Sequence, residues 1–276
     1  MGGLLLVDGH NLLFRMFYGM PFPFYNQSNK NITATVGFIG TVVKMIKYLN
    51  VANCLVVFDG ENSRDIREVN YKSYKANRET NFGMLPDNEN PFVQLEYIKA
   101  SLDYLRIKWI ETDCCECDDY IAMIAQQFDG KVFISSTDTD FFQLVNDWVK
   151  IIKFKGKNSV LIDKQYIYRC YGINPEDFVL YKALVGDSSD NIRGIDNVGP
   201  KTAKKIINSI LDSDNNRFFA IYNKNIDLIT RNLQLIKLPN KEMDHTCIDL
   251  KDLSVNFELI KNFKPLKIIS EITKEL

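Results

Sequence analysis

The sequence predicts an α/β fold, in which helices flank a mostly parallel central sheet and a helical portion follows it. Three short, uninterrupted apolar runs support this prediction, at residues 4–7, 55–58 and 132–135. Runs of this kind are typical of strands buried on both faces, as strands of a parallel sheet are. Helical patterns lie between the runs, and this alternation is typical of a sheet covered by helices on both faces.

Two helices are predicted between these strands. Residues 34–49 carry apolar side chains at helical spacing. Residues 91–105 begin with a proline, which the first position of a helix tolerates, and repeat the same spacing. Residues 78–90, with a glycine, a proline and several asparagines, are expected to form a loop. From about Pro175 onward strand patterns fade, so the C-terminal portion is predicted to be helical.

Composition limits the class of protein. The chain has 276 residues, of which 46% are hydrophobic and 25% charged, and its formal net charge is −1. These values are typical of a globular protein and argue against disorder. No apolar run reaches the roughly 18–20 residues that span a bilayer. The first run is too short for a signal peptide, so a soluble intracellular protein is expected.

The cysteines fit an intracellular location. Six cysteines at irregular spacing in a long chain do not indicate a disulfide framework. Cys114 and Cys117 form a C-x2-C pair, but a structural zinc site needs a second pair or nearby histidines. The sequence contains two histidines, His10 and His245, so zinc is not favoured.

Acidic residues follow all three apolar runs. Asp8 and Asp59 come directly after two of them, while Asp138 and Asp140 follow the third and would point to one side of an extended chain. Ligands of open α/β sheets bind beyond the carboxyl ends of the strands, so these positions favour a metal site. Other acids lie three residues apart, as neighbours on a helical face do. The nine candidate metal ligands are Asp8, Asp59, Glu116, Asp118, Asp119, Asp138, Asp140, Asp187 and Asp190.

Clustered carboxylates repel one another, and bound cations remove that cost. Mg²⁺ prefers oxygen ligands, whereas cysteine or histidine would favour softer metals. Two such ions about 4 Å apart can activate a water and stabilise the leaving oxygen of a phosphodiester. For any one of these acids a helix cap is the better explanation, but nine at strand ends and helix starts favour the metal site.

Two basic segments predict a nucleic-acid partner in spite of the overall charge. Setting the nine acids aside turns the net charge of −1 into +8. In residues 64–78, basic side chains at helical spacing alternate with tyrosines, which suits a phosphate backbone and its bases. A solvated amphipathic helix is the alternative for this segment.

The second basic segment spans residues 191–205. Gly199 and Pro200 mark a helix start, where free backbone amides bind phosphate oxygens. Lys201, Lys204 and Lys205 add positive charge. We expect a helix–hairpin–helix at about residues 183–211 that grips the backbone of one strand without reading its sequence. An ordinary helix cap is the alternative.

Taken in order, these motifs resemble the 5′-nuclease, or flap endonuclease, family, which includes bacteriophage 5′-exonucleases and the N-terminal nuclease domain of bacterial DNA polymerase I. The similarity covers about 200 residues, and seven motifs in order are far more specific than any one of them. They are LLLVDG at residues 4–9, FDG at 58–60, YKANR at 74–78, ECDD at 116–119, STDTD at 136–140, GDSSDNI at 186–192 and VGPKTA at 198–203.

The resemblance implies a metal-dependent nuclease that acts on 5′-flap, branched or 5′-ended DNA, with RNA–DNA hybrids as further substrates. It implies two Mg²⁺ ions, for which Mn²⁺ can substitute, and a K⁺ ion on backbone carbonyls of the helix–hairpin–helix. The first metal cluster would comprise Asp8, Asp59, Glu116, Asp118 and Asp138. The second would comprise Asp140, Asp187 and Asp190, with Asp119 near both.

The resemblance also implies roles for basic residues. Lys75 and Arg78 match residues of the family's helical arch that contact the scissile phosphate. Tyr74 would stack on the substrate, and Arg15 would bind phosphate. The expected catalytic residues are Lys75, Arg78, Asp138 and Asp140. The other expected DNA-binding residues are Arg64, Lys72, Gly199, Lys201, Thr202, Lys204 and Lys205.

The sequence departs from the family pattern at a few positions. Cys117 stands where alanine is common, and the arch, at about residues 64–90, is short. Asn197 replaces the first glycine of the usual hairpin. Asparagine tolerates left-handed backbone, so the turn is expected to survive.

We therefore expect residues 1–174 to form the α/β nuclease core with the arch, and residues 175–276 to form the helical portion. The expected activity is that of a Mg²⁺-dependent 5′-3′ exodeoxyribonuclease and flap endonuclease in DNA replication and repair. No polymerase region follows, so a stand-alone monomer is expected, in the cytoplasm of a bacterial or phage-infected cell, without a membrane partner. The alternatives are a non-catalytic branched-DNA-binding relative, a PIN-type ribonuclease and an α/β hydrolase of small phosphate esters.

Overall fold

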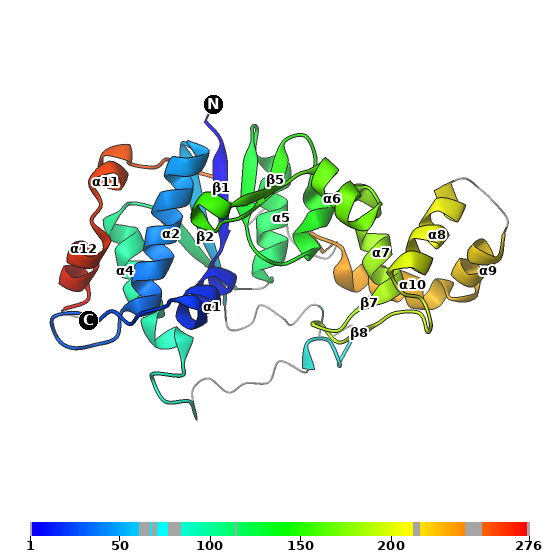
Figure 1. Ribbon diagram of the computed structural model, residues 1–276, viewed down its shortest axis with the longest axis horizontal. Coiled ribbons are helices and arrows are strands. Elements are labelled where there is room, and N and C mark those ends of the chain that lie inside the picture. Colours follow the sequence, from blue (N-terminus) through cyan, green and yellow to red (C-terminus); the bar gives the residue numbers. More distant parts are fainter. Residues whose placement is uncertain are drawn as a thin grey trace.

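The computed structural model describes residues 2–60, 67, 71–76, 84–113, 115–211, 216–240 and 250–274. A six-stranded sheet lies in its N-terminal part, in the order β3-β2-β1-β4-β5-β6 (Figure 1). Neighbouring strands are parallel except for β5 and β6. The strands are β1 (Leu4–Asp8), β2 (Asn53–Asp59), β3 (Lys108–Thr112), β4 (Val132–Ser135), β5 (Val149–Lys153) and β6 (Val160–Ile162). The predicted α/β class with a mostly parallel sheet is confirmed.

Helices cover both faces of this sheet (Figure 1). The helices of the N-terminal part are α1 (Gly9–Gly19), α2 (Thr33–Leu49), α4 (Leu95–Tyr104), α5 (Cys117–Gln127) and α6 (Lys164–Tyr171). Those that follow are α7 (Phe178–Val185), α8 (Pro200–Leu211), α9 (Arg217–Lys224), α10 (Ile226–Ile236), α11 (Phe257–Asn262) and α12 (Pro265–Ile272). None of the helices that the structure describes combines the length and apolar character needed to cross a bilayer.

The central strand β1 shows why the sheet needs helices on both sides. Leu5 and Val7 belong to a hydrophobic cluster that includes α1, α2 and α4. Leu4 and Leu6 belong to a second cluster that includes α5. All four side chains are fully buried, as the alternation of side chains along a strand requires when both faces are covered.

The strand order places a topological switch point between β1 and β4. From β1 the chain proceeds outward through β2 and β3, and from β4 it proceeds the other way through β5. In open α/β sheets the crevice beyond the carboxyl ends of the strands at such a point is the usual ligand site. Asp8 ends β1, and the segment that follows β4 carries Asp138 and Asp140.

Three strands were not predicted from the sequence, because they combine polar and apolar side chains instead of being uniformly apolar. β3 contains lysine, glutamate and threonine, and β5 contains two lysines, since both strands lie toward the edges of the sheet. β6 is a three-residue edge strand with two exposed side chains. Solvent reaches such strands on one side, so no continuous apolar run marks them.

The helix predicted over residues 91–105 is divided. Residues Pro91–Gln94 form a 3-10 turn, and α4 begins only at Leu95. The Gln94 side chain is buried at this junction, where its amide oxygen accepts hydrogen bonds from the backbone nitrogen and hydroxyl of Thr35 in α2. This tie between two helices sets the position at which the regular helix starts.

The predicted helical stripe over residues 64–78 is wrong for residues 71–76, although Arg67 is helical and its carbonyl accepts from Tyr71 N. Residues 71–76 form turns, in which Tyr74 N donates to Tyr71 O and Lys75 has a positive φ of 53°. Lys72 and Lys75 therefore do not share a helical face. With this turn, Tyr74 and Lys75 point into the protein, as described below. Arg64 and Arg78 lie outside the described residues.

The helical portion begins with α7 and a short hairpin. Strands β7 (Gly186–Asp187) and β8 (Ile192–Arg193) pair in antiparallel fashion. Gly186 has a φ of 85°, and a Cβ atom there would lie 2.4 Å from the backbone nitrogen of Gly194. Only glycine fits where the two backbone segments approach so closely. The turn that follows places Asp187 and Asp190 near Asp140.

The last two helices return to the N-terminal part. α12 packs on α2 and α4 (Figure 1), and Ile269 is fully buried there. The buried Asn26 side chain donates a hydrogen bond of 2.9 Å to Thr273 O. The chain thus covers its first helices with its final segment.

Candidate active site

Asp8 lies at the centre of the site, where β1 passes into α1. Its carboxylate accepts hydrogen bonds from Asn11 N at 3.0 Å and from Ser136 Oγ at 2.8 Å. The first bond caps α1, and the second ties the end of β1 to the segment after β4. Asp8 is therefore both a helix cap and a member of the carboxylate group at the switch point.

The pKa values of Asp8 and Asp118 show that these acids repel one another. Burial, together with the charges of Asp59 and Asp138, raises the pKa of Asp8 from 3.8 to about 6, against two hydrogen bonds that lower it. Burial, with the charges of Asp138 and Asp8, raises the pKa of Asp118 well above its usual range. Carboxylates in this situation are stabilised by a cation.

This repulsion predicts a pH dependence for the protein in a chelator. A raised folded-state pKa means that the native state binds the extra proton, so its contribution to stability is full below 3.8 and is lost as pH rises through 6. The Asp8 contribution amounts to about 3 kcal/mol. Thermal unfolding with EDTA should show a falling Tm between pH 4 and 6.5, and excess Mg²⁺ at pH 7.5 should restore it. A Tm that rises over this interval in EDTA would contradict the prediction.

Asp59, at the end of β2, is held in place by two donors. Its oxygens accept from Cys117 N at 2.8 Å and face His10 Nδ1 at 3.3 Å. Burial raises the pKa of Asp59, but these hydrogen bonds and the charge of Lys75 outweigh burial and bring it below its ordinary value. Cys117 itself turns away, donating to Val57 O, and burial raises the pKa of its thiol. The carboxylates, rather than sulfur, therefore face the site.

Glu116 and Asp119 are paired with cationic side chains. Arg67 donates to Glu116 and, through both terminal nitrogens, to Asp119 at 2.6 and 2.9 Å. Asp119 also accepts from Asn240 N. Lys75 donates to the other oxygen of Glu116. Asp119 was expected near both metal clusters, but both of its oxygens instead accept hydrogen bonds from Arg67.

Tyr74 does not offer a ring to the substrate. Its side chain is 4% exposed, its hydroxyl donates to Glu116 at 2.9 Å, and Lys75 Nζ lies 4.9 Å from the ring centroid. The expected stacking on substrate is wrong for this conformation because the ring is part of the core beneath the acids.

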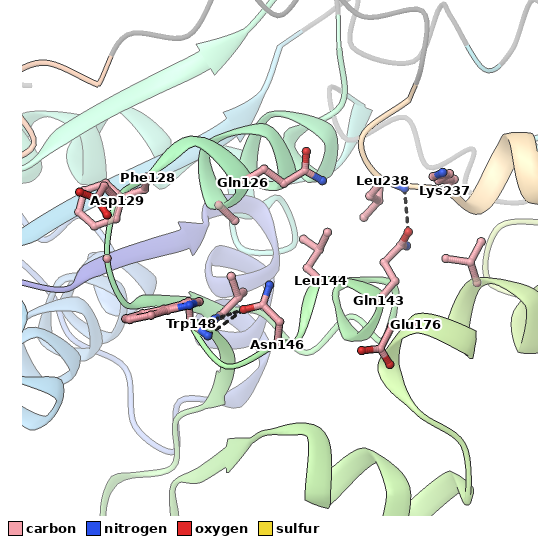
Figure 2. A pocket seen from close by; sticks show the side chains of 14 residues that line it. Gln126, Phe128, Asp129, Gln143, Leu144, Asn146, Trp148, Glu176, Lys237 and Leu238 are labelled. Carbon is pink, nitrogen blue, oxygen red and sulfur yellow. Dashed lines mark hydrogen bonds between the residues drawn. The ribbon is translucent and has the colours of Figure 1, made fainter.

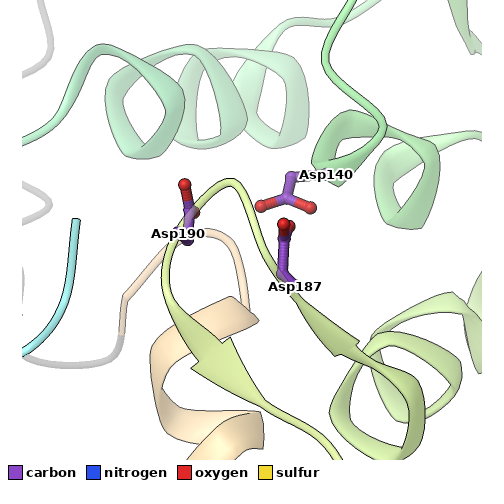
Figure 3. A group of neighbouring side chains, drawn as sticks. All are labelled: Asp140, Asp187 and Asp190. Carbon is purple, nitrogen blue, oxygen red and sulfur yellow. The ribbon is translucent and has the colours of Figure 1, made fainter. Parts of the chain in front are cut away.

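Asp140, Asp187 and Asp190 form a compact second group (Figure 3). One oxygen from each lies within 4.8 Å of the others. Asp140 starts a 3-10 turn (Asp140–Leu144), and its backbone nitrogen donates to Asp138, so the two acids do not lie on an extended chain as expected. Three carboxylates at this spacing fit a hard divalent cation.

A lysine lies against this second group. Lys182 is 7% exposed and donates to Asp140 and, at 2.5 Å, to Asp187 Oδ2. Burial raises the pKa of Asp187, but the Lys182 ammonium and hydrogen bonds from Ser189 outweigh it and lower the pKa to about 2. Asp187 is therefore held as a carboxylate.

Arg15 faces the first group from α1. The charge of Asp8 raises its pKa, but burial dominates and lowers it. Among the described residues, its Nη2 is buried without a hydrogen-bond partner. A buried guanidinium nitrogen of this kind is a suitable donor for an anionic ligand.

The residues predicted to form the helix–hairpin–helix include the start of α8. Asn197 has a φ of 62°, so asparagine does adopt the left-handed backbone expected of it. Gly199 O accepts from Thr202 N and Ala203 N, and α8 begins at Pro200 as predicted. Lys201 and Lys205 are exposed. The Lys204 ammonium instead lies against Gly172 at the end of α6, which leaves it less available.

Three site residues were missed by sequence interpretation, namely His10, Arg67 and Lys182. Lys182 carried a usable signal, because it is the one charged residue in the otherwise apolar helix α7. Arg67 was seen as one of several basic residues in a stripe. Nothing in the sequence indicated that it points inward.

A pocket of about 550 Å³ lies elsewhere, at the amino-terminal edge of the sheet (Figure 2). Phe128, Trp148 and Leu238 are among its lining residues, and Gln143 bridges to Leu238 N across it. None of the predicted site residues lines this pocket. The carboxylate groups are therefore the stronger candidate site.

Comparison with known proteins gives two family models that match in tandem. The model described as 5′-3′ exonuclease, N-terminal resolvase-like domain matches residues 3–172. The model described as 5′-3′ exonuclease, C-terminal SAM fold matches residues 173–268.

Individual relatives agree with this result. DNA polymerase I of Borreliella burgdorferi is 31% identical over 274 residues, which is 97% of this chain and 29% of the polymerase. A 5′-3′ exonuclease of Buchnera aphidicola is 30% identical and is covered over 89% of its length, with 97% of this chain. The chain thus spans about three tenths of the polymerase I relative and most of the exonuclease.

Among solved structures, the D15 flap endonuclease of bacteriophage T5, in a complex with DNA and metal ions, superimposes with a TM-score of 0.67. It is 25% identical to this chain, and the match covers 98% of both chains.

Proposed function

The chain belongs to the 5′-3′ exonuclease family, and from this premise we propose that it is a Mg²⁺-dependent, structure-selective 5′-nuclease. The family resemblance predicted from the sequence motifs is confirmed by the same matches. The proposed reaction is hydrolysis of DNA phosphodiesters near a 5′ end or at a 5′-flap, in primer or flap removal during replication and repair.

The observation that carries this proposal is that acids from five parts of the chain come together beyond the carboxyl ends of the strands. Asp8 and Asp59 end adjacent strands, Asp118 opens α5, and Asp138 follows β4. The charges of Asp59 and Asp138 raise the pKa of Asp8, and those of Asp138 and Asp8 raise the pKa of Asp118, which supports the closeness of these acids. The group around Asp187 adds a second set of oxygens.

We assign two ions to these two groups. Asp8, Asp59, Asp118 and Asp138 would hold one, with Glu116 close by, and Asp140, Asp187 and Asp190 would hold the other. Bound there, two Mg²⁺ ions would supply an activated water and neutralise charge on the scissile phosphate. The proposed ligands of both groups are carboxylates, which supports a hard cation, with Mn²⁺ as a substitute.

The basic residues would act on the DNA itself. Lys75 lies at the carboxylate site and is charged, since Glu116 and Asp118 outweigh burial and raise its pKa. There, with Arg78, it would stabilise charge that develops on the phosphate. Arg15 would donate its unpaired nitrogen to a phosphate oxygen. The start of α8, with Gly199, Lys201, Thr202 and Lys205, would grip the backbone of one strand.

We propose the same division of labour between two parts of the chain, residues 1–174 for hydrolysis and residues 175–276 for binding the duplex. The two family models meet at residues 172 and 173, which supports a boundary there. The hairpin that carries Asp187 and Asp190 would nevertheless lend metal ligands from the second part to the first.

The alternatives explain less of the molecule. A non-catalytic relative would have lost carboxylates, and all nine are present. In a PIN-type ribonuclease the turn at Asn197 and the lysines of α8 would be superfluous, as they would in a hydrolase of small phosphate esters.

A cleavage assay with mapped products tests the proposed function. A 5′-labelled flap duplex with Mg²⁺ should be cut near the junction, whereas the same duplex in EDTA and an RNA hairpin should remain intact. Asp138→Asn should abolish the cut. Intact flap with the wild-type protein, or wild-type rates with Asp138→Asn, would show that the proposed function is wrong.

A further inference from the structure

We propose that Lys182 is an internal competitor of the second metal ion, whose ammonium neutralises Asp140 and Asp187 until a divalent cation takes over their oxygens. The inference rests on the proposed function in that it assigns an ion to Asp140, Asp187 and Asp190. It goes further because it proposes that the Lys182 ammonium occupies the position of that ion until the ion binds.

The burial of Lys182 is the first observation behind this inference. A lysine is rarely buried without partners, because an unpaired ammonium is costly to remove from water. Lys182 is 7% exposed in an otherwise apolar helix, and it forms ion pairs with Asp140 and Asp187. The ammonium and the carboxylates therefore compensate each other's charge within the protein, which lowers the cost of burying them.

The second observation is the choice of oxygen on Asp187. Its Oδ1 accepts from both the backbone nitrogen and the hydroxyl of Ser189, at 2.8 and 2.6 Å. Its Oδ2 accepts from Lys182 at 2.5 Å. Since Ser189 engages Oδ1, the oxygen best placed for a metal ion is the one that the ammonium takes.

The third observation is the flexibility of the competitor. A lysine head is a compact charge on a four-carbon stem, so it can withdraw without movement of the helix. A divalent ion brings twice the charge and would repel the ammonium at this distance. Ion and ammonium therefore exclude each other, and binding of the ion must include the displacement of Lys182.

The consequence is a reduced affinity for the second ion. Removing the lysine charge while keeping its length should tighten metal binding at this group by about fivefold or more, the size of an ordinary coupling between two ligands. A purely structural lysine would give the opposite result, because its loss would loosen the carboxylates and weaken binding.

The test is a Mn²⁺ titration by calorimetry without DNA. Asp187→Asn identifies the binding event that belongs to the second group. Lys182→Met should tighten that event about fivefold or more, and Lys182→Arg, which keeps the charge, should stay within about twofold of wild type. The gain should vanish in the double variant Lys182→Met, Asp187→Asn.

Lys99→Met is the matched control. Lys99 also pairs with two acids, Glu96 at 2.9 Å and Glu111 at 2.8 Å, but these lie on α4 and β3 outside both metal groups. Its substitution should leave Mn²⁺ affinity unchanged. An equal gain in Lys99→Met would show that the effect is one of net charge alone and would overturn the proposal.

The proposal is also overturned if Lys182→Met binds at the Asp187-dependent site no more tightly than wild type, or if Lys182→Arg gains as much. Should Lys182→Met fail to fold in chelator, Lys182→Gln replaces it, because it keeps a hydrogen-bond donor without the charge. Expected Mn²⁺ affinities in a protein that does not cut flaps would contradict the proposed function and leave this inference standing.

Discussion

Asp118→Asn is expected to lower Mg²⁺-dependent flap cleavage by at least about a hundredfold, since even residues that only support a metal ligand are worth up to that much. The same substitution should raise the Tm of the protein in EDTA. Burial, with the charges of Asp138 and Asp8, raises the pKa of Asp118 well above its usual range. Asparagine has nearly the same shape as aspartate but no charge. The substitution therefore removes this repulsion, and it also replaces a charged oxygen ligand of the metal with a neutral one.

Opposite effects on activity and stability distinguish this prediction from simple damage to the fold. Asp113→Asn is the matched control, because Asp113 is an exposed acid close to Asp118 in the chain. It should change neither cleavage nor Tm. An Asp118→Asn protein that is less stable in EDTA than wild type would contradict the assignment of mutually repelling carboxylates.

Arg67→Met is expected to destabilise the protein by about 3–5 kcal/mol, the cost of breaking a buried ion pair from one side. Arg67 is 3% exposed and binds Glu116, Asp119 and the backbone oxygen of Leu235 at the end of α10. Without it, Asp119 keeps its burial but loses its cation. Urea unfolding at pH 7.5, with the free energy extrapolated to water, measures the effect.

The control for Arg67→Met is Arg193→Met. Arg193 also forms an ion pair, with Asp196 at 2.7 Å, but both side chains are 72% exposed. Exposed pairs contribute little to stability, so its unfolding curve should be close to that of wild type. Equal destabilisation by the two substitutions would show that burial of the Arg67 network is not what makes it important.

The acids at the sheet edge could be predicted because they follow strands that are apolar without interruption. Asp8 and Asp59 each come at the end of such a run, and the rule that ligands bind beyond the carboxyl ends of strands then brings them together. The same reasoning could not find β3 or β5, because charged and polar side chains interrupt their apolar residues.

The cationic side of the site was less predictable, because it depends on which way a side chain points. Lys75 and Tyr74 were placed on an exposed helical stripe, yet a positive φ at Lys75 turns both toward Glu116. Positive φ at a lysine has no signature in the sequence. Arg67 and Lys182 pair with acids 49 and 42 residues away in the chain, separations over which local patterns carry no information.

The return of α11 and α12 to the first helices affects how the protein can be divided. Val255, Ile260, Phe263 and Ile269 fill the same apolar layer as α2 and α4. A fragment that stopped at residue 240 would uncover that layer and leave the Asn26 amide without Thr273. The N-terminal part is therefore covered by helices from the C-terminal end of the chain, and a fragment that ended at the junction of the two family models would expose this apolar layer and be prone to aggregate.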